Sequence, residues 1–507
     1  MLKRLLLSLA MLTGLSLSAE TPLNYEAELL LNGGSGKFAP YYIASNRHGI
    51  ITQPYDALLD LSSGKSLDLS RRFSYGFGAE FLTGYSSKTD YLRYDIENNA
   101  WIDNRQGPPA IFLQQLYGEV KYRGVFLMVG LKEYESALLN FSLSSGDLIE
   151  SGNSRPIPQV RAGFVDFQKI PFTNGWVEIQ GELSYGKMTD NNWVKNHFNY
   201  YNFHYNVGAL YTYKRCYFRT KSSMPFSVTV GMQTAGFFGG TSYFYNQGKL
   251  VLTTKSSKSL KSFLKMFLPT QGEGNSYYDG STLGSWDIML RYRFRSGHIL
   301  KAYLQKPWED GSGIGWMNGF DGVWGLEYLS PDPHSIVSGA IFEFLDFTNQ
   351  SGPIHWSPTD SPGTTLTDHA TGGDQYYNNY QYNSYMNYGM SIGTPFLPAP
   401  LYNLNGYPGY VNNRVRGFHI GLTGHIGNFD YRLLGGYRKG WGDSRKPVLR
   451  AKDDTSLMAE VGYDVHQFQG FSVKAQLAYD GGELFGNNFG ACISLRYSGL
   501  ISNLFGK

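Results

Sequence analysis

The residue types best suited to ligand chemistry gather in one segment, between Gly373 and Met390. It reads Asp-Gln-Tyr-Tyr-Asn-Asn-Tyr-Gln-Tyr-Asn-Ser-Tyr-Met-Asn-Tyr-Gly, so tyrosines alternate with amide side chains. Aromatic faces stack on the apolar faces of sugar rings, and Asn, Gln and Asp side chains match sugar hydroxyls. The segment therefore predicts carbohydrate recognition; the alternative is a long loop that its own tyrosines pack and anchor at a membrane interface. The predicted glycan-binding residues here are Tyr376, Tyr377, Tyr380 and Tyr382.

A second segment, Arg155-Pro-Ile-Pro-Gln-Val-Arg161, carries two prolines two residues apart. Proline enforces an extended backbone and removes a hydrogen-bond donor, so Arg155, Gln159 and Arg161 are predicted to point together into a lumen or cleft. One hypothesis is that these side chains bind an acidic polysaccharide. The other is that an ordered loop folds inward and is held by Arg–carboxylate pairs.

The sequence contains only one weak match to an enzymatic motif. Gly442-Asp-Ser444 is similar to the start of an esterase motif, and Asp464 and His466 follow it as hypothetical triad partners. No following Leu and no block of oxyanion donors accompanies Ser444, so the sequence predicts no catalytic residues and no enzyme.

Metal and cofactor sites are not predicted either. His419 and His425 are six residues apart in an extended pattern, so they face the same side and are interpreted as polar groups lining a lumen. The glycines lie in predicted turns and strand interiors, and they form no phosphate-binding loop. Cys216 and Cys492 are interpreted as unpaired strand residues.

Polar and apolar residues alternate along runs of about nine to eleven residues, the length that crosses a bilayer as a tilted strand. One face of these runs is apolar, with aromatic residues at both ends, and the other carries charges such as Glu178, Glu182 and Lys474. An apolar outside and a polar inside favour a membrane barrel over a soluble β-protein, because strands in lipid must close on themselves. The clearest runs are 73–81, 177–185, 286–294, 471–479 and 489–497, with Arg291 and Arg293 on the polar face of the third.

Composition and connections agree with an all-β antiparallel transmembrane barrel. Charged residues make up 17% of the chain, while Tyr (39), Phe (32) and Gly (61) are abundant. The formal net charge is +3 with no long run of one sign, so nucleic acid is not a predicted partner. The length predicts 16 to 20 strands. Short turns at 123–124 and 427–428 contrast with long loops at 84–110, 140–173, 240–282 and 350–413, and 260–268 is either a short helix or a packed loop segment.

The N-terminus predicts export. Lys3 and Arg4 precede an apolar run from Leu5 to Leu17, which is too short to span a bilayer, and Ser18-Ala19 follows. Residues 1–19 are therefore predicted to be a signal peptide and 20–507 a single barrel in the outer membrane of a Gram-negative bacterium.

Several blocks in order along the chain resemble the capsule-assembly Wzi family, in its Bacteroidota branch. The most distinctive is Gly152 to Arg161, and Pro40 to Gly49 is another. Further blocks are Gly175-Trp176, Tyr185 to Trp193, Gln233 to Gly240, and those beginning at Tyr376, Ile392 and Asn413.

The resemblance implies an 18-stranded outer-membrane barrel, with long loops partly filling its lumen, that binds capsular polysaccharide and helps attach or assemble the capsule. The implied partners are capsular or other surface polysaccharide, outer-membrane lipids and lipopolysaccharide, and the barrel-assembly machinery, with no cofactor. The chain departs from the enteric members, which carry an N-terminal helical portion, because Tyr25–Leu31 has a strand pattern. The alternative function is a channel for oligosaccharides or other solutes, and a lumen filled by inward loops would disfavour it.

Overall fold

The computed structural model describes residues 23–267, 280–352, 355–356, 370–371 and 373–501. The predicted signal peptide, 1–19, lies outside these residues. No helix among them is long and apolar enough to cross a membrane.

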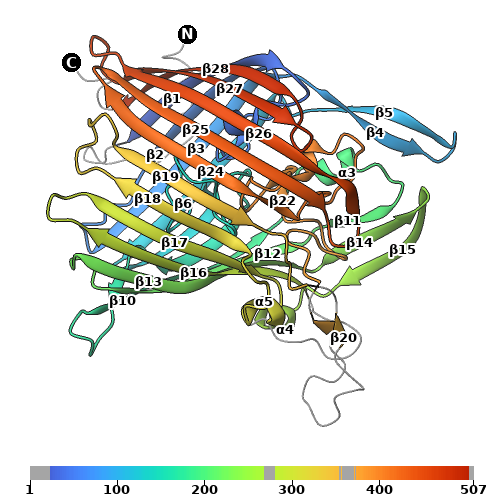
Figure 1. The fold of residues 1–507 in the computed structure, drawn as a ribbon, viewed down its shortest axis with the longest axis horizontal. Helices are drawn as coiled ribbons and strands as arrows, with labels where there is room; N and C mark the ends of the chain where they lie inside the picture. Colours follow the sequence, from blue (N-terminus) through green and yellow to red (C-terminus); the bar gives the residue numbers. More distant parts are fainter. Residues whose placement is uncertain (1–22, 268–279, 353–354, 357–369, 372, 502–507) are drawn as a thin grey trace.

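Eighteen antiparallel strands close into a barrel, as predicted (Figure 1). The closure pairs the first strand with the last, from Asn24 opposite Leu500 to Ser35 opposite Phe489. Two short strands, β8 (Gln159–Phe164) and β9 (Gln168–Lys169), share one position in the wall because both pair with β10. The other wall strands are β1 (Asn24–Ser35), β2 (Asp56–Lys65), β3 (Phe73–Ser86), β6 (Ile111–Tyr122), β7 (Val125–Leu131), β10 (Val177–Lys187), β12 (Leu210–Thr220), β13 (Phe226–Phe238), β16 (Gly280–Arg293), β17 (Ile299–Trp308), β18 (Gly322–Leu329), β19 (Gly339–Asp346), β24 (Val415–Ile426), β25 (Phe429–Gly442), β26 (Pro447–Asp464), β27 (Phe471–Gly482) and β28 (Asn488–Leu500).

The predicted alternation places one side chain in two on the lumen side of the wall. On β10, Glu178, Glu182 and Ser184 point into the lumen and are buried. Tyr185, the next residue after Ser184, points outward and is exposed. Leucine, valine and aromatic side chains cover the exterior of the other strands, as the apolar band of a membrane barrel requires.

The two ends of the barrel differ. At the end we call the turn end, β1 begins, β28 ends, and connections such as 123–124 and 427–428 are short. At the loop end, the connections include 36–55, 87–110, 132–158, 188–209, 309–321 and 347–414 (Figure 1). The predicted loop 140–173 is shorter than expected, because Gln159–Phe164 continues the wall as β8.

Three loop-end segments fold into the lumen: 36–55 with α2 (Tyr41–Ala44), 132–158, and 373–413 with β22 (Met386–Asn387), β23 (Met390–Ser391) and η1 (Pro400–Tyr402). We call these three segments the plug. Their apolar side chains form two buried clusters with the wall, which include Leu143, Ile149, Tyr377 and Phe396 in one and Tyr41 in the other. The prediction that long loops fill part of the lumen is therefore confirmed.

The plug corrects one expectation. A polar interior was predicted, and buried charged groups such as Arg438, Asp454 and Asp480 do line the loop half of the wall, but aromatic side chains lie among them. Nearer the loop end, lumen-facing Tyr211, Tyr213 and Phe237 are buried against the plug. Aromatic lining is favourable there because the plug, rather than water, covers these side chains.

Other loop-end elements lie outside the lumen. β4 (Thr89–Asp95) and β5 (Ala100–Gln106) form a hairpin, and β11 (Phe203–Val207), β14 (Gly240–Asn246) and β15 (Lys249–Ser256) form a small sheet. The short helices are α3 (Trp193–His197), α4 (Leu260–Phe267) and α5 (Gly311–Ile314), and β20 (His355–Trp356) pairs with β21 (Ala370–Thr371). Of the two possibilities left open for 260–268, the structure shows a short helix over Leu260–Phe267, and Cys216 and Cys492 are free, as predicted.

Candidate functional site

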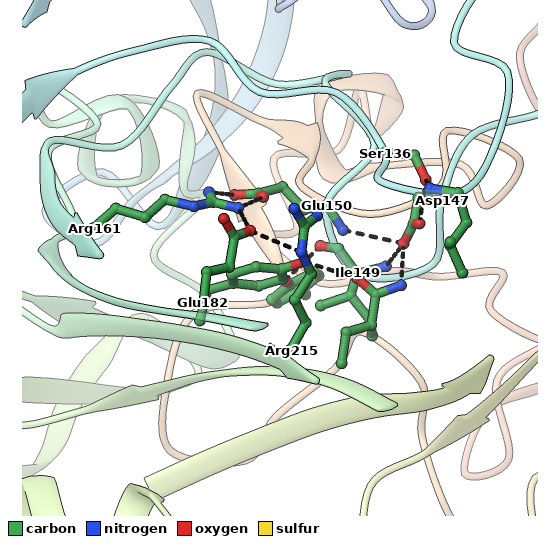
Figure 2. A network of polar contacts seen from close by, with 11 residues as sticks. Ser136, Asp147, Ile149, Glu150, Arg161, Glu182 and Arg215 are labelled. Carbon is green, nitrogen blue, oxygen red and sulfur yellow. Dashed lines mark hydrogen bonds and ion pairs between the residues drawn. The ribbon is translucent and has the colours of Figure 1, made fainter. Parts of the chain in front are cut away.

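Arg161, one of the predicted glycan-binding residues, anchors the plug to the wall. Its guanidinium donates to both Glu150 carboxylate oxygens, at 3.0 and 2.8 Å, and to Glu182 of β10 (Figure 2). Arg215 of β12 forms a further ion pair with Glu182 at 3.0 Å. Since Glu150 belongs to plug segment 132–158, this network ties the segment to three neighbouring strands. The hypothesis of a loop held by Arg–carboxylate pairs is confirmed for Arg161.

Asp147 provides a second anchor for the same segment. Its carboxylate accepts hydrogen bonds from Gln233 of β13 at 2.8 Å and from Gln305 of β17 at 2.9 Å. Ser136 donates to it at 2.6 Å and the Ile149 amide at 2.8 Å (Figure 2). All described hydrogen bonds to Asp147 thus come from the plug segment itself and from two wall strands.

Arg155 and Gln159 are also buried. The Arg155 guanidinium lies 3.5 Å from the centre of the Phe112 ring and 4.6 Å from that of Tyr388. Asn387 donates a hydrogen bond to the Arg155 carbonyl at 2.9 Å, which joins two plug segments. In this structure both arginines therefore contact protein groups, and glycan contact by Arg155, Gln159 and Arg161 stays a prediction.

The predicted tyrosines separate into two environments. Tyr376, Tyr377 and Tyr382 are buried in the plug, whereas Tyr380 is 53% exposed. The Tyr377 hydroxyl donates to the Leu148 carbonyl at 2.6 Å, and Tyr376 donates to Asp321 at 2.9 Å. Three of the four predicted glycan contacts would thus require the plug to open, and Tyr380 is the one already at the surface.

Tyr380 lines a pocket of about 520 Å³ at the loop end. We call it the loop-end pocket. Parts far apart along the chain build it: the small sheet of β11, β14 and β15, the start of β16, residues 309–310 just after β17, the tyrosine-rich segment, the turn around 407 and the turn at 443–446.

One side of the loop-end pocket is aromatic. The Phe203 ring lies 4.3 Å from the His204 ring and 4.7 Å from the Tyr407 ring, and His204 lies 5.0 Å from Phe244. His204 also hydrogen-bonds the Tyr382 carbonyl at 2.9 Å, so the small sheet is fastened to the tyrosine-rich segment. These contacts gather several aromatic rings along one side of the cavity, and aromatic rings are the side chains that stack on sugar rings.

The other side is polar. The Gln375 side chain donates to Ser444 at 3.0 Å, and the Asn379 oxygen accepts from the Gln381 and Tyr382 amides. Lys446 lies 4.7 Å from the Tyr407 ring centre. Amide, carboxylate and ammonium groups beside aromatic faces match the alternating hydroxyl and C–H surfaces of a carbohydrate.

Two carboxyl groups line the pocket, Asp374 buried and Glu309 partly buried. Burial, together with the Asp374 carboxylate, raises the pKa of Glu309 above its usual range, and burial together with Asp310 raises the pKa of Asp374. The backbone N–H of Gln375 donates to the Glu309 carboxylate at 2.9 Å, and the Ser351 hydroxyl donates to the Asp374 carboxylate at 2.5 Å. Both carboxyl groups thus favour the protonated form when the pocket is formed.

This pair predicts that the pocket loosens as pH rises. Because the folded-state pKa values lie above the unfolded ones, the folded pocket binds more protons, and its stability falls from about pH 4 upward through the raised pKa values. Backbone amides of 375–385 should exchange roughly tenfold faster at about pH 8 than at about pH 5, after correction for intrinsic rates. Asp374→Asn should flatten this difference; an unchanged pH profile in the variant would contradict the assignment.

The hypothetical triad of Ser444, Asp464 and His466 is wrong. Ser444 lies before β26 at the loop end, and the other two lie at the turn end of that strand, which has 18 residues and so spans about 60 Å. His419 faces the lumen as predicted: Tyr42 and the Leu143 carbonyl hydrogen-bond its ring nitrogens, each at 2.7 Å.

Sequence reasoning missed the residues that the other loops bring to the pocket. Phe203, Phe244 and Tyr407 belong to aromatic stretches far apart along the chain, and nothing local to each indicates a common cavity. The aromatic clusters at 200–205 and 243–245 were the available indication.

The closed wall, its apolar exterior and its loop-filled lumen define the molecule as an outer-membrane β-barrel. No family model matches the chain, and no curated protein does. Among solved structures, it is similar to Escherichia coli Wzi, described as an outer-membrane protein involved in group 1 capsule assembly and as a carbohydrate-binding β-barrel. The TM-score is 0.55 at 12% identity, over 93% of this chain and 83% of that one.

Two other solved barrels are similar at lower scores: OccAB2 of Acinetobacter baumannii, at TM-score 0.46 and 8% identity, and OccK5 of Pseudomonas aeruginosa, at 0.44 and 8%. Each of these two matches covers 95% of this chain and 98% of the other chain. The likeness to Wzi supports a Wzi-like outer-membrane barrel fold, while membership in the Bacteroidota branch stays a prediction.

Proposed function

We propose that this chain is a non-enzymatic surface protein that binds capsular or other surface polysaccharide at its loop end and helps attach or assemble the capsule. The observation that carries the proposal is the loop-end pocket, where aromatic rings and amides from distant loops surround one cavity. The proposal places the loop end at the cell exterior and the turn end in the periplasm, which is the usual arrangement of outer-membrane barrels. The predicted signal peptide, 1–19, and assembly by the barrel-assembly machinery belong to the same proposal.

The plug supports a binding role over the alternative, a solute channel. Its segments are packed into two apolar clusters and tied to the wall by Arg161 and Asp147. A cavity of about 300 Å³ remains on the turn side, lined by Arg47 and His48 of the plug and by wall groups such as Glu460 and Lys474. Planar-bilayer recordings distinguish the two functions: a silent barrel agrees with binding, and steady conductance would favour the channel.

Glycan binding by the purified barrel tests the pocket directly. Tyr380→Ala should weaken binding of a glycan identified on an array by about tenfold, because it removes one stacking face. Tyr55→Ala is the matched control: Tyr55 is also 53% exposed but does not line the pocket. Equal affinity of the Tyr380 variant and the wild type would contradict a site here.

The capsule role requires a cellular test. Deletion of the gene should release capsule from the surface into the medium, visible by microscopy, and wild-type protein should restore attachment while Tyr380→Ala restores it only in part. A capsule that stays attached after deletion would refute the capsule role. Glycan binding by the purified barrel would remain a separate result.

A further inference from the structure

Helix α4 lies on the lipid-facing side of the barrel wall. Its Phe263 ring lies 5.2 Å from that of Tyr185, which projects outward from β10 and itself lies 6.0 Å from the Phe238 ring. Phe238 faces outward because its neighbour Phe237 is part of the lumen cluster. Figure 1 shows α4 close to the loop-side ends of β13 and β16, and the helix contacts β13.

Contacts with the wall hold the helix in place. Met266 is buried against Gly236 of β13 and Gly280 of β16, where a Cβ would come within 2.6 and 2.4 Å of its side chain. Lys214, on the outer face of β12, donates a hydrogen bond to the Met266 carbonyl. At the start of the helix, the Ser259 hydroxyl accepts from the Ser262 amide at 3.2 Å and acts as an N-cap.

The helix lies at the depth of the loop-side membrane interface. On β13, outward-facing Phe226 and Phe238 mark the two ends of the exterior band, 12 residues apart. At about 3.3 Å per residue and a tilt of about 40°, this separation corresponds to about 30 Å, the thickness of the hydrocarbon core. Since α4 contacts the loop-side end of this band, it lies where interfacial aromatic residues meet head groups.

The side of α4 that faces away from the barrel is apolar. Leu260 and Leu264, one turn apart, are 71% and 59% exposed, whereas Ser262 and Met266 face the wall and are buried. Two exposed leucines on a short helix are unfavourable in water and favourable in acyl chains. Exposed lysines accompany them: Lys255, Lys258 and Lys261 recur every three residues. No ion pair joins these lysines to another residue that the structure describes.

We infer that α4 and the lysines before it form an interfacial lipid-binding element. Leu260 and Leu264 enter the acyl chains of the loop-side leaflet, and Lys258 and Lys261 bind the phosphate groups of its lipids, which in an outer membrane are those of lipid A in lipopolysaccharide. Exposed leucines beside lysines on one short helix are the composition of an interfacial amphipathic helix. The element is independent of the glycan pocket and would remain if that proposal failed.

Native mass spectrometry of the full-length barrel, titrated with lipid A in an uncharged detergent, tests the inference. Lys258→Gln with Lys261→Gln should lower the apparent affinity about thirtyfold, since each lysine near an anionic surface contributes about fivefold. Lys249→Glu changes the net charge equally, lies at the far tip of the small sheet, and should leave binding unchanged. Dephosphorylated lipid A should bind the wild type as weakly as lipid A binds the double variant.

Hydrogen exchange in nanodiscs provides the second measurement. The amides of 257–267 should be protected more in lipid A discs than in detergent, and Leu260→Ser with Leu264→Ser should abolish that difference. Heat-modifiable electrophoretic mobility checks that each variant is a folded barrel. Equal lipid A binding by the double lysine variant and the wild type, or pairing of two barrels through α4 without lipid A, would overturn the inference.

Discussion

Arg161→Ala is expected to turn a silent barrel into a conducting one. The substitution leaves the Glu150 and Glu182 carboxylates buried without their shared cation, which costs about 3–5 kcal/mol when one partner of a buried pair is removed. Segment 132–158 would lose the tie that joins it to β8 and β10, and the remaining Asp147 contacts do not replace a bidentate ion pair. We expect the wild type to show no steady current in planar bilayers and the variant to show long-lived openings.

The matched control is Arg219→Ala. Arg219 lies on the same strand as Arg215 and pairs with Glu178 at 2.6 Å, near the turn end and away from the plug. Arg219→Ala removes one positive charge from the wall, as Arg161→Ala does, and should leave the current near zero. If both variants stay silent while remaining folded, the plug is held mainly by its apolar clusters and the Arg161 network is not its principal anchor.

Tyr377→Ala is expected to release the tyrosine-rich segment from the rest of the plug. The side chain is buried, and its hydroxyl donates to the Leu148 carbonyl at 2.6 Å and accepts from the Thr394 amide at 3.0 Å, so it joins plug segments 132–158 and 373–413. Truncation of a buried aromatic residue costs about 3–5 kcal/mol. Tyr377→Phe removes only the hydroxyl and should cost about 1–3 kcal/mol. Hydrogen exchange over 373–413 should therefore rise steeply in the alanine variant and modestly in the phenylalanine variant.

Tyr380→Ala separates packing from ligand contact in the same segment. It should leave exchange over 373–413 near wild type and weaken glycan binding, whereas Tyr377→Ala should change both, because the pocket loses its support. A Tyr380 variant that loosens the whole segment would show that this exposed tyrosine is structural, and a Tyr377→Ala variant with wild-type exchange would show that the segment is held from elsewhere.

Much of the wall was predictable from local pattern. Along 471–479 and 489–497, alternation alone determines which side chains face lipid, since neighbouring residues of a strand point to opposite faces. Closure then follows, because a strand edge cannot stay unpaired in lipid. The number of strands was predictable only within a range, from 16 to 20, because chain length does not show how much of it is loop.

The plug and the pocket were decided by tertiary structure. A tyrosine that stacks on a sugar and one that packs a plug need the same properties, an apolar ring and a hydrogen-bonding hydroxyl, so composition alone does not separate Tyr377 from Tyr380. The same holds for Arg161, whose partners Glu150 and Glu182 become neighbours only when segment 132–158 turns inward.

The sequence by itself thus determined a membrane barrel with one apolar and one polar face, and a segment with the chemistry of carbohydrate recognition. The tertiary structure alone decided that the lumen is filled, that most of the predicted binding residues hold the plug together, and that Tyr380 meets rings from distant loops in one pocket. The physical reason is the range of the interactions. Strand alternation is a property of neighbouring residues, whereas the direction of a loop depends on burial and ion pairs between residues far apart in the chain.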